Sequence, residues 1–255
     1  METITSRQNP LCTHLRKLSS STAYRRQCGE FLCDSPKLLQ EALLWQAEIT
    51  VVVSTSPLPR LPEHIRQVQV PEDVMASISP VKTPQGVLFT CRLPQALLPQ
   101  TLTGRRYVLL DGVQDPGNVG TLLRSAAAFG FDGVLLSDGC ASVFAPKTLR
   151  ASMGAAVRIP VIEAGKMPEA IALLREKGIT CLAAALYQSQ PLSAAASSCP
   201  DGVCVVIGSE GQGLTDETIA ACTGTVRIPM TDRVESLNAG IAGSILLWHF
   251  REESL

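Results

Sequence analysis

Residues 107–130 read YVLLDGVQDPGNVGTLLRSAAAFG, and the rest of the chain is predicted to be organised around this stretch. An apolar segment with the composition of a strand leads into a turn at Pro116 and Gly117, and a helical pattern then runs to Gly130. A buried strand that delivers a glycine-rich loop onto a helix N-terminus commonly builds a ligand site, because free backbone N–H groups collect there. The same arrangement can also be purely structural. The polar residues on the helix are the features that favour a ligand site over a structural role.

The chain beyond this stretch keeps alternating between strand and helix patterns. Strands are predicted at 133–136, 180–184, 203–207 and 226–228, and helices at 119–129, 147–153, 168–177, 216–221 and 236–250. Residues 193–198 are rich in alanine and serine and are predicted to form a loop. Continuous apolar strands joined by helices predict an α/β fold with a parallel sheet covered on both faces.

A smaller α/β unit is predicted ahead of this sheet. Strands are expected at 31–33, 49–54 and 86–91, and helices at 6–18 and 36–44, with Ser35 as the N-cap of the second helix and Pro36 in its first turn. Residues 93–104 carry two prolines and no charge, which is typical of a linker. We therefore expect a first domain over 1–92, a linker over 93–104 and a second domain over 105–255.

Composition excludes several classes of protein. The 255 residues are 45% hydrophobic and 18% charged, as in a globular protein, and no apolar run reaches the roughly 20 residues of a membrane span. The first ten residues lack the apolar core of a signal peptide, so a cytoplasmic location is expected. Nine scattered cysteines without a CxxC pair indicate reduced, mostly buried thiols, and the three histidines have no metal-ligand spacing, so no metal is expected.

Charge is uneven along the chain. The formal net charge is −1, but residues 1–40 hold six basic residues against three acidic ones. A local basic surface attracts nucleic acid even when the whole protein is neutral, although the same residues also fit the solvated face of a helix. The residues of this segment that we select for nucleic-acid contact are Arg16, Lys17, Arg25 and Arg26.

The helix predicted at 119–129 has two distinct faces. Its apolar stripe consists of Val119, Leu122, Leu123, Ala126 and Phe129. Arg124 falls on a different face, one turn after Gly120. Because helical side chains lean toward the N-terminus, Arg124 is expected to pass over Gly120 toward Asn118, at a strand-end crevice where open α/β sheets bind ligands. An exposed surface charge is the alternative interpretation.

A second segment, VCVVIGSEGQGL at 203–214, ends an apolar strand in three glycines that bracket Glu210. Glycine permits positive φ and close backbone approach, so this loop can wrap a flat ligand such as adenosine. The segment does not match the dinucleotide-binding fingerprint, because the acidic residue lies inside the loop. The chain has no GKS or GKT sequence either, which excludes a phosphate-binding P-loop.

A third segment, VRIPMTDRVESLNAGIAGSILLWHF at 226–250, reads as a strand, a proline turn and a helix. Ser236 or Asn238 can cap that helix, but capping explains only one of them. Small residues follow at Ala239, Gly240, Ala242 and Gly243. Such residues let another backbone approach closely, which fits packing either within the chain or against a second subunit.

Three motifs in this order resemble those of the SpoU, or TrmH-type, RNA 2′-O-ribose methyltransferases of the SPOUT superfamily. They are NVGTLLR (118–124, the first motif), IGSEGQGL (207–214, the second motif) and IPMTDRVESLNAGIA (228–242, the third motif). The segments SRQNP, RRQCGEFL and SPVKTPQGVL are similar to the small RNA substrate-binding domain that often precedes this catalytic domain. The resemblance covers nearly the whole chain.

The resemblance implies a SPOUT domain with a parallel sheet and a deep trefoil knot, which is a rare exception among unknotted folds. It also implies S-adenosylmethionine as the cofactor, rRNA or tRNA as the substrate and a homodimer with the active site near the subunit interface. No membrane or DNA partner is expected. The cofactor residues that it implies are Gly208, Gly213, Ile228, Met230, Leu237 and Asn238.

Arg124 matches the catalytic arginine of the family, and the other motif polar residues are Asn118, Glu210, Ser236 and Asn238. An arginine side chain stays protonated in proteins, so it is a poor base. Two roles stay open for Arg124: it relays the proton of the 2′-hydroxyl with help from an RNA phosphate, or it stabilises the developing alkoxide and clamps the phosphate. Asn118 with Ser236 or Asn238 is expected to orient the ribose and cofactor. Glu210 either shapes its loop or orders Arg124.

Arg150 lies in APKTLRASMGA, a segment that also resembles the family, and it fits a phosphate contact and a structural ion pair equally well. The chain departs from the family in two places. Asp232 and Arg233 stand where many relatives carry a glycine, and CDSPKLL at 33–39 replaces a more usual acidic-glycine pattern. An RNA-binding protein that has lost catalysis is the main alternative, and a nucleotide-dependent oxidoreductase lacks its loop signature.

Overall fold

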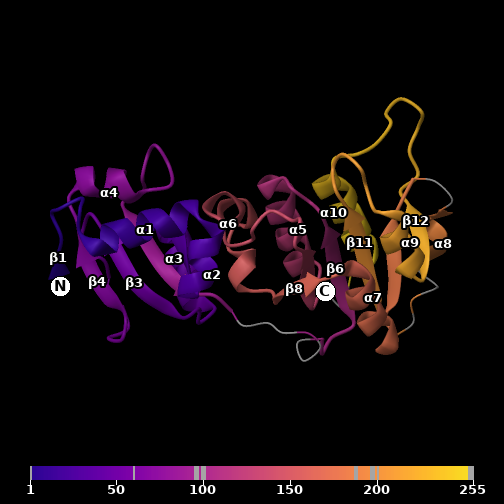
Figure 1. The fold of residues 1–255 in the computed structure, drawn as a ribbon, viewed down its shortest axis with the longest axis horizontal. Coiled ribbons are helices and arrows are strands. Elements are labelled where there is room, and N and C mark those ends of the chain that lie inside the picture. Colours follow the sequence, from indigo (N-terminus) through magenta and orange to yellow (C-terminus); the bar gives the residue numbers. More distant parts are fainter. Residues whose placement is uncertain are drawn as a thin grey trace. The chain divides into compact units, whose positions relative to one another are not determined.

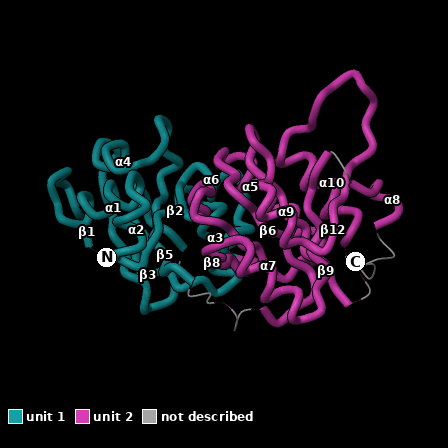
Figure 2. The backbone as a smooth tube through the Cα atoms, turned by 45° about the vertical axis from the view of Figure 1, so that its right-hand side comes forward, with its two compact units in different colours: residues 1–94, 144–157 teal, residues 95–143, 158–255 magenta. Residues whose placement is uncertain are grey.

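The computed structural model describes residues 2–59, 61–94, 98, 102–186, 189–195, 199 and 201–251. The chain divides into two compact units, the first comprising residues 1–94 and 144–157 and the second residues 95–143 and 158–255 (Figure 2). Residues 144–157, which we expected in the second domain, are therefore grouped with the first unit. Half of the predicted linker at 93–104 lies outside the described residues.

The first unit is built on a mixed five-stranded sheet in the order β1-β4-β3-β5-β2 (Figure 1). Its strands are β1 (Glu2–Thr3), β2 (Glu30–Asp34), β3 (Ile49–Ser54), β4 (Arg66–Gln69) and β5 (Val87–Arg92). Its helices are α1 (Pro10–Ser20), α2 (Thr22–Cys28), α3 (Pro36–Leu44), α4 (Glu72–Ile78) and α6 (Pro146–Ser152), with a 3-10 turn at Ala155–Val157. β5 runs antiparallel to β2 and β3, whereas β4 pairs in parallel with β1 and β3.

Side-chain caps fix where helices of the first unit begin. The Asn9 side chain accepts a hydrogen bond from the Leu11 N–H at 2.9 Å, so α1 begins at Pro10 and not at residue 6 as predicted. Cys12, Leu15 and Leu18 of α1 are buried in one core with strand residues of the sheet. The predicted cap of α3 is confirmed, because Ser35 Oγ accepts from the Leu38 N–H at 3.2 Å.

The second unit is a seven-stranded sheet in the order β10-β12-β9-β11-β6-β7-β8, and every strand pair is parallel (Figure 1). The strands are β6 (Arg106–Asp111), β7 (Gly133–Ser137), β8 (Val161–Gly165), β9 (Thr180–Ala184), β10 (Gln190–Pro191), β11 (Val203–Gly208) and β12 (Gly224–Arg227). The helices are α5 (Pro116–Ala128), α7 (Met167–Glu176), α8 (Leu192–Ala195), α9 (Asp216–Ala221) and α10 (Ala239–His249). The predicted parallel sheet is confirmed.

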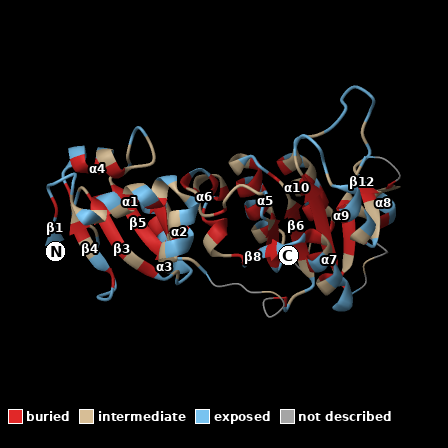
Figure 3. Cartoon of the chain, in the orientation of Figure 1, coloured by how far each residue is buried: buried red, intermediate tan, exposed pale blue. Residues whose placement is uncertain are grey.

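Both faces of this sheet are covered, because strand side chains alternate in direction. Tyr107 and Leu109 pack with Ile171 and Leu174 of α7, while the residues between them turn to the face that carries α5 and α10. Buried residues follow the strands through the middle of the unit (Figure 3).

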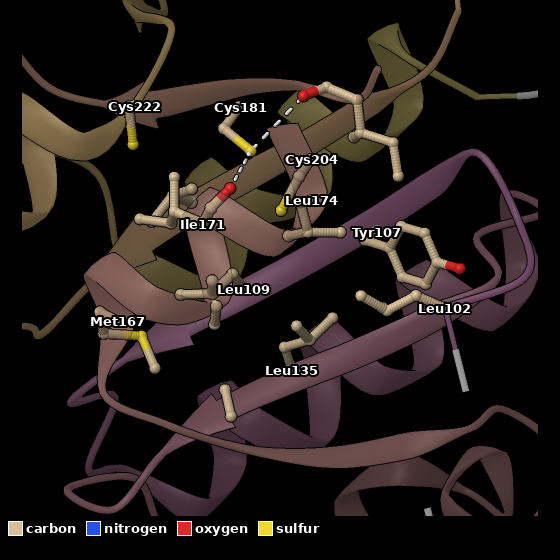
Figure 4. Packing of buried hydrophobic residues seen from close by; sticks show 14 of the residues in the cluster. Leu102, Tyr107, Leu109, Leu135, Met167, Ile171, Leu174, Cys181, Cys204 and Cys222 are labelled. Carbon is tan, nitrogen blue, oxygen red and sulfur yellow. Dashed lines mark hydrogen bonds between the residues drawn. The ribbon is translucent and has the colours of Figure 1, made fainter. Parts of the chain in front are cut away.

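Three cysteines, Cys181, Cys204 and Cys222, belong to the core beneath α7 (Figure 4). All nine cysteines of the chain are free thiols and six of them are buried, as predicted. Burial raises the pKa of Cys222 to about 12, so its thiol stays protonated at neutral pH.

Helices α5 and α10 lie side by side on the other face of the sheet. A Cβ atom on Gly243 would overlap Leu122 Cδ2 and Ile207 Cδ1, so a larger residue there would force these side chains to shift. The hydroxyls of Ser125 and Ser244 lie 2.8 Å apart. The small residues of the third motif thus serve packing within the chain, one of the two uses that the sequence left open.

The predicted helices and strands are found with few changes. The ranges 36–44, 49–54, 180–184 and 216–221 are confirmed to the residue. β1, β4, β8, β10, α2 and α4 were not predicted. The loop predicted at 193–198 is wrong where α8 occupies 192–195, and residues 196–198 lie outside the described part of the chain. Among the described helices, none has the length and hydropathy of a membrane span.

Candidate active site

The turn between β6 and α5 is held by an aspartate that sequence reasoning overlooked. Asp115 Oδ1 accepts a hydrogen bond from the Asn118 N–H at 2.9 Å and caps α5. Gly112 adopts a φ of 68°, a conformation that favours glycine. An Asp directly before Pro116 is a recognisable helix start, so the signal was present in the sequence.

Glu210, in the loop after β11, binds this same turn. Its Oε1 accepts hydrogen bonds from the Asp115 N–H at 3.1 Å and from Asn118 Nδ2 at 2.8 Å, and its Oε2 accepts from the Gln114 N–H at 3.1 Å. The second motif is therefore joined to the first across 92 residues of sequence. These bonds hold the turn that leads into α5, and both roles expected for Glu210, shaping its loop and ordering Arg124, stay predictions.

The Glu210 loop closes on itself. Ser209 and Gly213 exchange two backbone hydrogen bonds of 3.0 and 3.1 Å, and Gly213 adopts a φ of 70°. A Cβ atom on Gly208 would overlap the backbone of Gly213. The glycines at 208 and 213 are thus required by the shape of the loop, whereas nothing lies within 4 Å of a Cβ built on Gly211.

The hydrogen bonds around Glu210 set its charge. Burial raises the pKa of this carboxyl, but the hydrogen bonds from Asn118 and from the backbone N–H groups of Gln114 and Asp115 outweigh it, and the net pKa lies below the ordinary value. Glu210 is therefore an anion at neutral pH and lies beside the positive end of the α5 dipole. The N–H groups that we expected to be free for a ligand are occupied by Asp115 and Glu210.

Asn118 connects all three motifs. Its side chain is buried, its Nδ2 donates to Glu210, and a Cβ atom built on Gly240 would lie 3.1 Å from its Oδ1 and 3.2 Å from Asn238 Oδ1. We expected Asn118 to orient the ribose, but in this structure it joins the start of α5 to the start of α10.

Arg124 lies two turns into α5 and is exposed. Among the described residues it has no hydrogen-bond or ion-pair partner, so all of its guanidinium donors are available to a ligand. The helix that carries it is fixed at its start by Asp115 and Glu210 and along its length by α10. Arg124 is thus a free cation on a rigid support.

The loop between β12 and α10 carries the third motif and projects from the unit (Figure 1). Residues 231–236 are all exposed, and no hydrogen bond joins residues 229–237 to any other described residue. Asn238 caps α10, since its Oδ1 accepts from the Ile241 N–H at 3.1 Å. Helix α10 therefore begins after Asn238 and not at Ser236, and capping accounts for Asn238 while leaving Ser236 free.

The residues predicted to hold the cofactor lie on these two loops. Gly208 and Gly213 belong to the loop after β11, whereas Ile228, Met230 and Leu237 are partly exposed on the loop after β12. The backbone polar groups of 229–237 are unbonded within the described chain, so they can serve a ligand with several donors and acceptors, such as an adenosine. Grouping the described side chains identifies no metal site of three or more His, Cys, Asp or Glu residues.

The residues predicted to contact RNA differ in their environment. Arg25 is buried and its guanidinium donates to the Leu18 carbonyl at 2.7 Å and to Thr22, so its selection as an RNA contact is corrected: it stabilises the ends of α1 and α2. Lys17 is exposed over the ring of Tyr24, and Arg26 is exposed.

The two remaining arginines of that set already have partners. Arg16 donates to the Arg7 carbonyl at 2.8 Å. Arg150 lies 3.2 Å from the carboxylate of Asp34, which corresponds to the structural ion pair of the two roles expected for it.

The comparison with known proteins agrees with this site. The model of the SpoU rRNA methylase family matches residues 105–248, which contain all three motifs and the site around Arg124. The chain belongs to the SpoU rRNA methylase family. Residues 9–88 match the model of an MRM3-like substrate-binding domain, in agreement with the expected N-terminal domain.

Individual relatives span nearly the full chain. The 23S rRNA (guanosine(2553)-2′-O)-methyltransferase RlmP of Bacillus subtilis is 31% identical over 98% of this chain and 100% of its own length. An rRNA methyltransferase from Sinorhizobium meliloti, solved with AdoMet (S-adenosylmethionine) bound, is 28% identical over 97% of this chain and 96% of its own, with a TM-score of 0.87. The SpoU methyltransferase AviRb from Streptomyces viridochromogenes, 21% identical with a TM-score of 0.83 over 95% and 97% of the two chains, shares the fold.

Proposed function

We propose that this protein is an AdoMet-dependent RNA methyltransferase that modifies a ribose 2′-hydroxyl of rRNA or tRNA. The observation that carries the proposal is the convergence of the three motifs at the start of α5, where Glu210, Asn118 and Gly240 lie close together; the same helix carries the exposed Arg124. No observation among the described residues favours a catalytically inactive RNA-binding protein over an enzyme. The family and its relatives support the same activity.

AdoMet fits the two loops that carry the second and third motifs. Gly208, Gly213, Ile228, Met230, Leu237 and Asn238 would hold it, and the backbone groups of Met230 and Leu237 have no partner within the described chain. The cofactor supplies an electrophilic methyl group on a sulfonium. The chain departs from the family pattern at Asp232, which lies in the most exposed part of this loop.

In our proposal Arg124 acts as a charged hydrogen-bond donor and not as a base. Its guanidinium would bind an RNA phosphate and the 2′-oxygen, lower the free energy of the developing alkoxide and keep the oxygen aligned for attack, while the proton of the 2′-hydroxyl would pass to the bound phosphate or to water. Glu210 and Asn118 act through α5, because they hold the helix that carries Arg124. Ser236 is exposed at the end of the β12–α10 loop and would contact the ribose or the cofactor in this proposal.

A homodimer forms in this proposal through the exposed face of α10. Ile241, Ile245 and Trp248 follow one another at helical spacing and are 54%, 36% and 54% exposed. An apolar stripe of this kind on a packed helix is typical of a protein interface. Because α10 lies beside α5, a partner on this stripe would be close to Arg124.

We also propose that this chain has the deep trefoil knot of the family and a cytoplasmic location. A deep trefoil knot is supported by the path of the C-terminal segment: after edge-proximal β12, α10 returns to pack against α5 and the central strand β11. A cytoplasmic location is supported by the rRNA substrate of the B. subtilis relative.

Transfer of an isotopically labelled methyl group tests the activity. The protein would be incubated with AdoMet carrying a deuterated methyl and with RNA from cells that lack the protein, and the RNA digested to nucleosides for mass spectrometry. We expect label on a ribose 2′-oxygen and heat of AdoMet binding in calorimetry. AdoMet binding without label in RNA would support the inactive alternative, and label on a base would contradict the ribose assignment.

A further inference from the structure

Asp34 and Arg150 form an unusual ion pair in the first unit. Asp34, at the end of β2, has a side chain that is only 10% exposed, whereas the Arg150 side chain on α6 is 37% exposed. One Arg150 nitrogen lies 3.2 Å from Asp34 Oδ2. Arginine has five N–H donors, so most of the guanidinium remains available to a second anion.

The other oxygen of Asp34 has no partner. Asp34 Oδ1 is buried and receives no hydrogen bond from any described residue. A buried carboxylate oxygen without a donor is costly. Arg150 makes one bond to Asp34, at Oδ2; a second, parallel bond to Oδ1 would satisfy that oxygen and fix the plane of the guanidinium.

The backbone next to Asp34 is also strained. Ser35 adopts φ 103° and ψ 145°, a region that residues other than glycine rarely occupy. Strain of this kind persists where the surrounding structure enforces it and is concentrated at functional sites. The strained residue thus directly follows the aspartate that pairs with Arg150.

We propose that Asp34 is a positioning residue that presents Arg150 to a phosphate of the RNA substrate. Asp34 holds the inner edge of the guanidinium, and the exposed outer edge binds the phosphate. This inference rests on the proposed function and names a contact of the same RNA. Arg150 thereby serves both uses that its sequence left open, the ion pair and the phosphate contact.

Net charge and the orientation of Arg150 predict opposite changes in RNA affinity for Asp34→Asn. The variant is one unit more positive, so simple electrostatics predicts tighter RNA binding. If Asp34 positions Arg150, loosening the guanidinium weakens binding despite the added charge. The exposed pair of Arg7 and Asp73, with side chains 59% and 57% exposed, offers a matched control in the same unit.

The experiment measures binding of full-length protein to a labelled 23S rRNA transcript and to a tRNA transcript over a range of salt, without AdoMet. We expect Arg150→Ala to bind about tenfold more weakly and to lower the slope of log affinity against log salt by about one. Asp34→Asn should bind several-fold more weakly with an unchanged slope. Asp73→Asn should bind as tightly as the wild type or slightly more tightly.

Thermal melting identifies any variant that fails to fold. If Asp34→Asn fails to fold, Arg150→Lys is tested in its place, because lysine keeps the charge but lacks the planar guanidinium. We then expect weaker RNA binding with the same dependence on salt. Wild-type affinity in either folded variant, or an unchanged slope in Arg150→Ala, would overturn the inference. A wild type that binds RNA but never methylates it would overturn the proposed function alone.

Discussion

Among single residues, Arg124 has the largest effect on the proposed methyl transfer. Replacing it by alanine removes the only proposed donor to the 2′-oxygen, so we expect methyl transfer to fall by about 10²- to 10³-fold. AdoMet affinity, which depends on loops elsewhere, should change by less than about twofold. Single-turnover transfer and calorimetry measure the two effects. Arg105→Ala, which removes an exposed arginine ahead of β6, is the control and should retain full turnover.

Glu210 predicts a dependence of stability on pH. Because its folded pKa is lowered, the carboxylate stabilises the fold above the unfolded pKa of about 4.3, and this contribution disappears as pH falls through the folded pKa. Glu210→Gln should therefore lower the free energy of unfolding at pH 7 by about 1 kcal/mol at most, since the site is exposed. Urea unfolding at pH 7 and below pH 4 measures this difference. A difference that persists unchanged in acid would contradict the assignment.

Residue types could be predicted from sequence more readily than their partners. Glycines and polar groups in three ordered motifs indicated Arg124, Asn118 and Glu210. The bond between Asn118 and Glu210 spans 92 residues, and no local pattern reports such a contact. Arg25 was misjudged for a related reason: its neighbours in sequence are polar, yet its guanidinium is buried against the Leu18 carbonyl.

Among the helices and strands, the packing of α10 on α5 predicts a loss of stability when Gly243 is replaced by a larger residue. Gly243→Ala would push a methyl group into Leu122, and overpacking of this kind costs about 1–3 kcal/mol. Gly211→Ala is the matched control, because its methyl would enter open space. Chemical denaturation of both variants measures the difference. Equal stability of the two would show that α5 and α10 are not packed as described.

At the start of α3, we expect the glycine variant of Ser35 to be more stable than the alanine variant, although glycine usually lowers stability relative to alanine. Ser35→Ala loses the cap and keeps the strained φ, so it should destabilise the protein by about 1–2 kcal/mol. Ser35→Gly also loses the cap but relieves the strain, so it should be about 1 kcal/mol more stable than the alanine variant. Thermal or urea unfolding of the pair decides this, and an alanine variant at least as stable as the glycine variant would contradict a strained Ser35.

Element prediction succeeded where apolar runs were continuous and failed where they were short or divided. β3, β9 and the central strands of the second unit are uninterrupted apolar segments. β8 was missed because Glu163 breaks its run, and β4 (RQVQ) has one buried residue. α1 and α10 were predicted to begin early because Asn9 and Asn238, which cap them, were not chosen as the helix starts, although Asn9 precedes Pro10 as Asp115 precedes Pro116.

At the scale of the whole molecule, the proposed dimer depends on the apolar stripe of α10. Ile245→Glu places a charge in its centre and should weaken association by ~2 kcal/mol or more, about 30-fold. Leu44→Glu, at an exposed leucine of the first unit, is the control and should leave association unchanged. Sedimentation across a range of concentrations measures both. A wild type that stays monomeric at micromolar concentration would contradict the dimer.

The order of strands predicted the general architecture, a small α/β unit followed by a parallel sheet. It did not predict that residues 144–157, between β7 and β8, would be grouped with the first unit. The reason is physical: Phe144 packs 4.7 Å from the ring of Phe31, and Arg150 pairs with Asp34, both of which are long-range contacts.

Mapping of 2′-O-methylated nucleotides tests the central claim most directly. RNA would be compared from cells with the protein, without it, and with the Arg124→Ala variant in its place. We expect that methylation at a defined ribose of rRNA or tRNA is lost without the protein, returns with the wild type and stays absent with the variant. An identical methylation map in all three strains would contradict it.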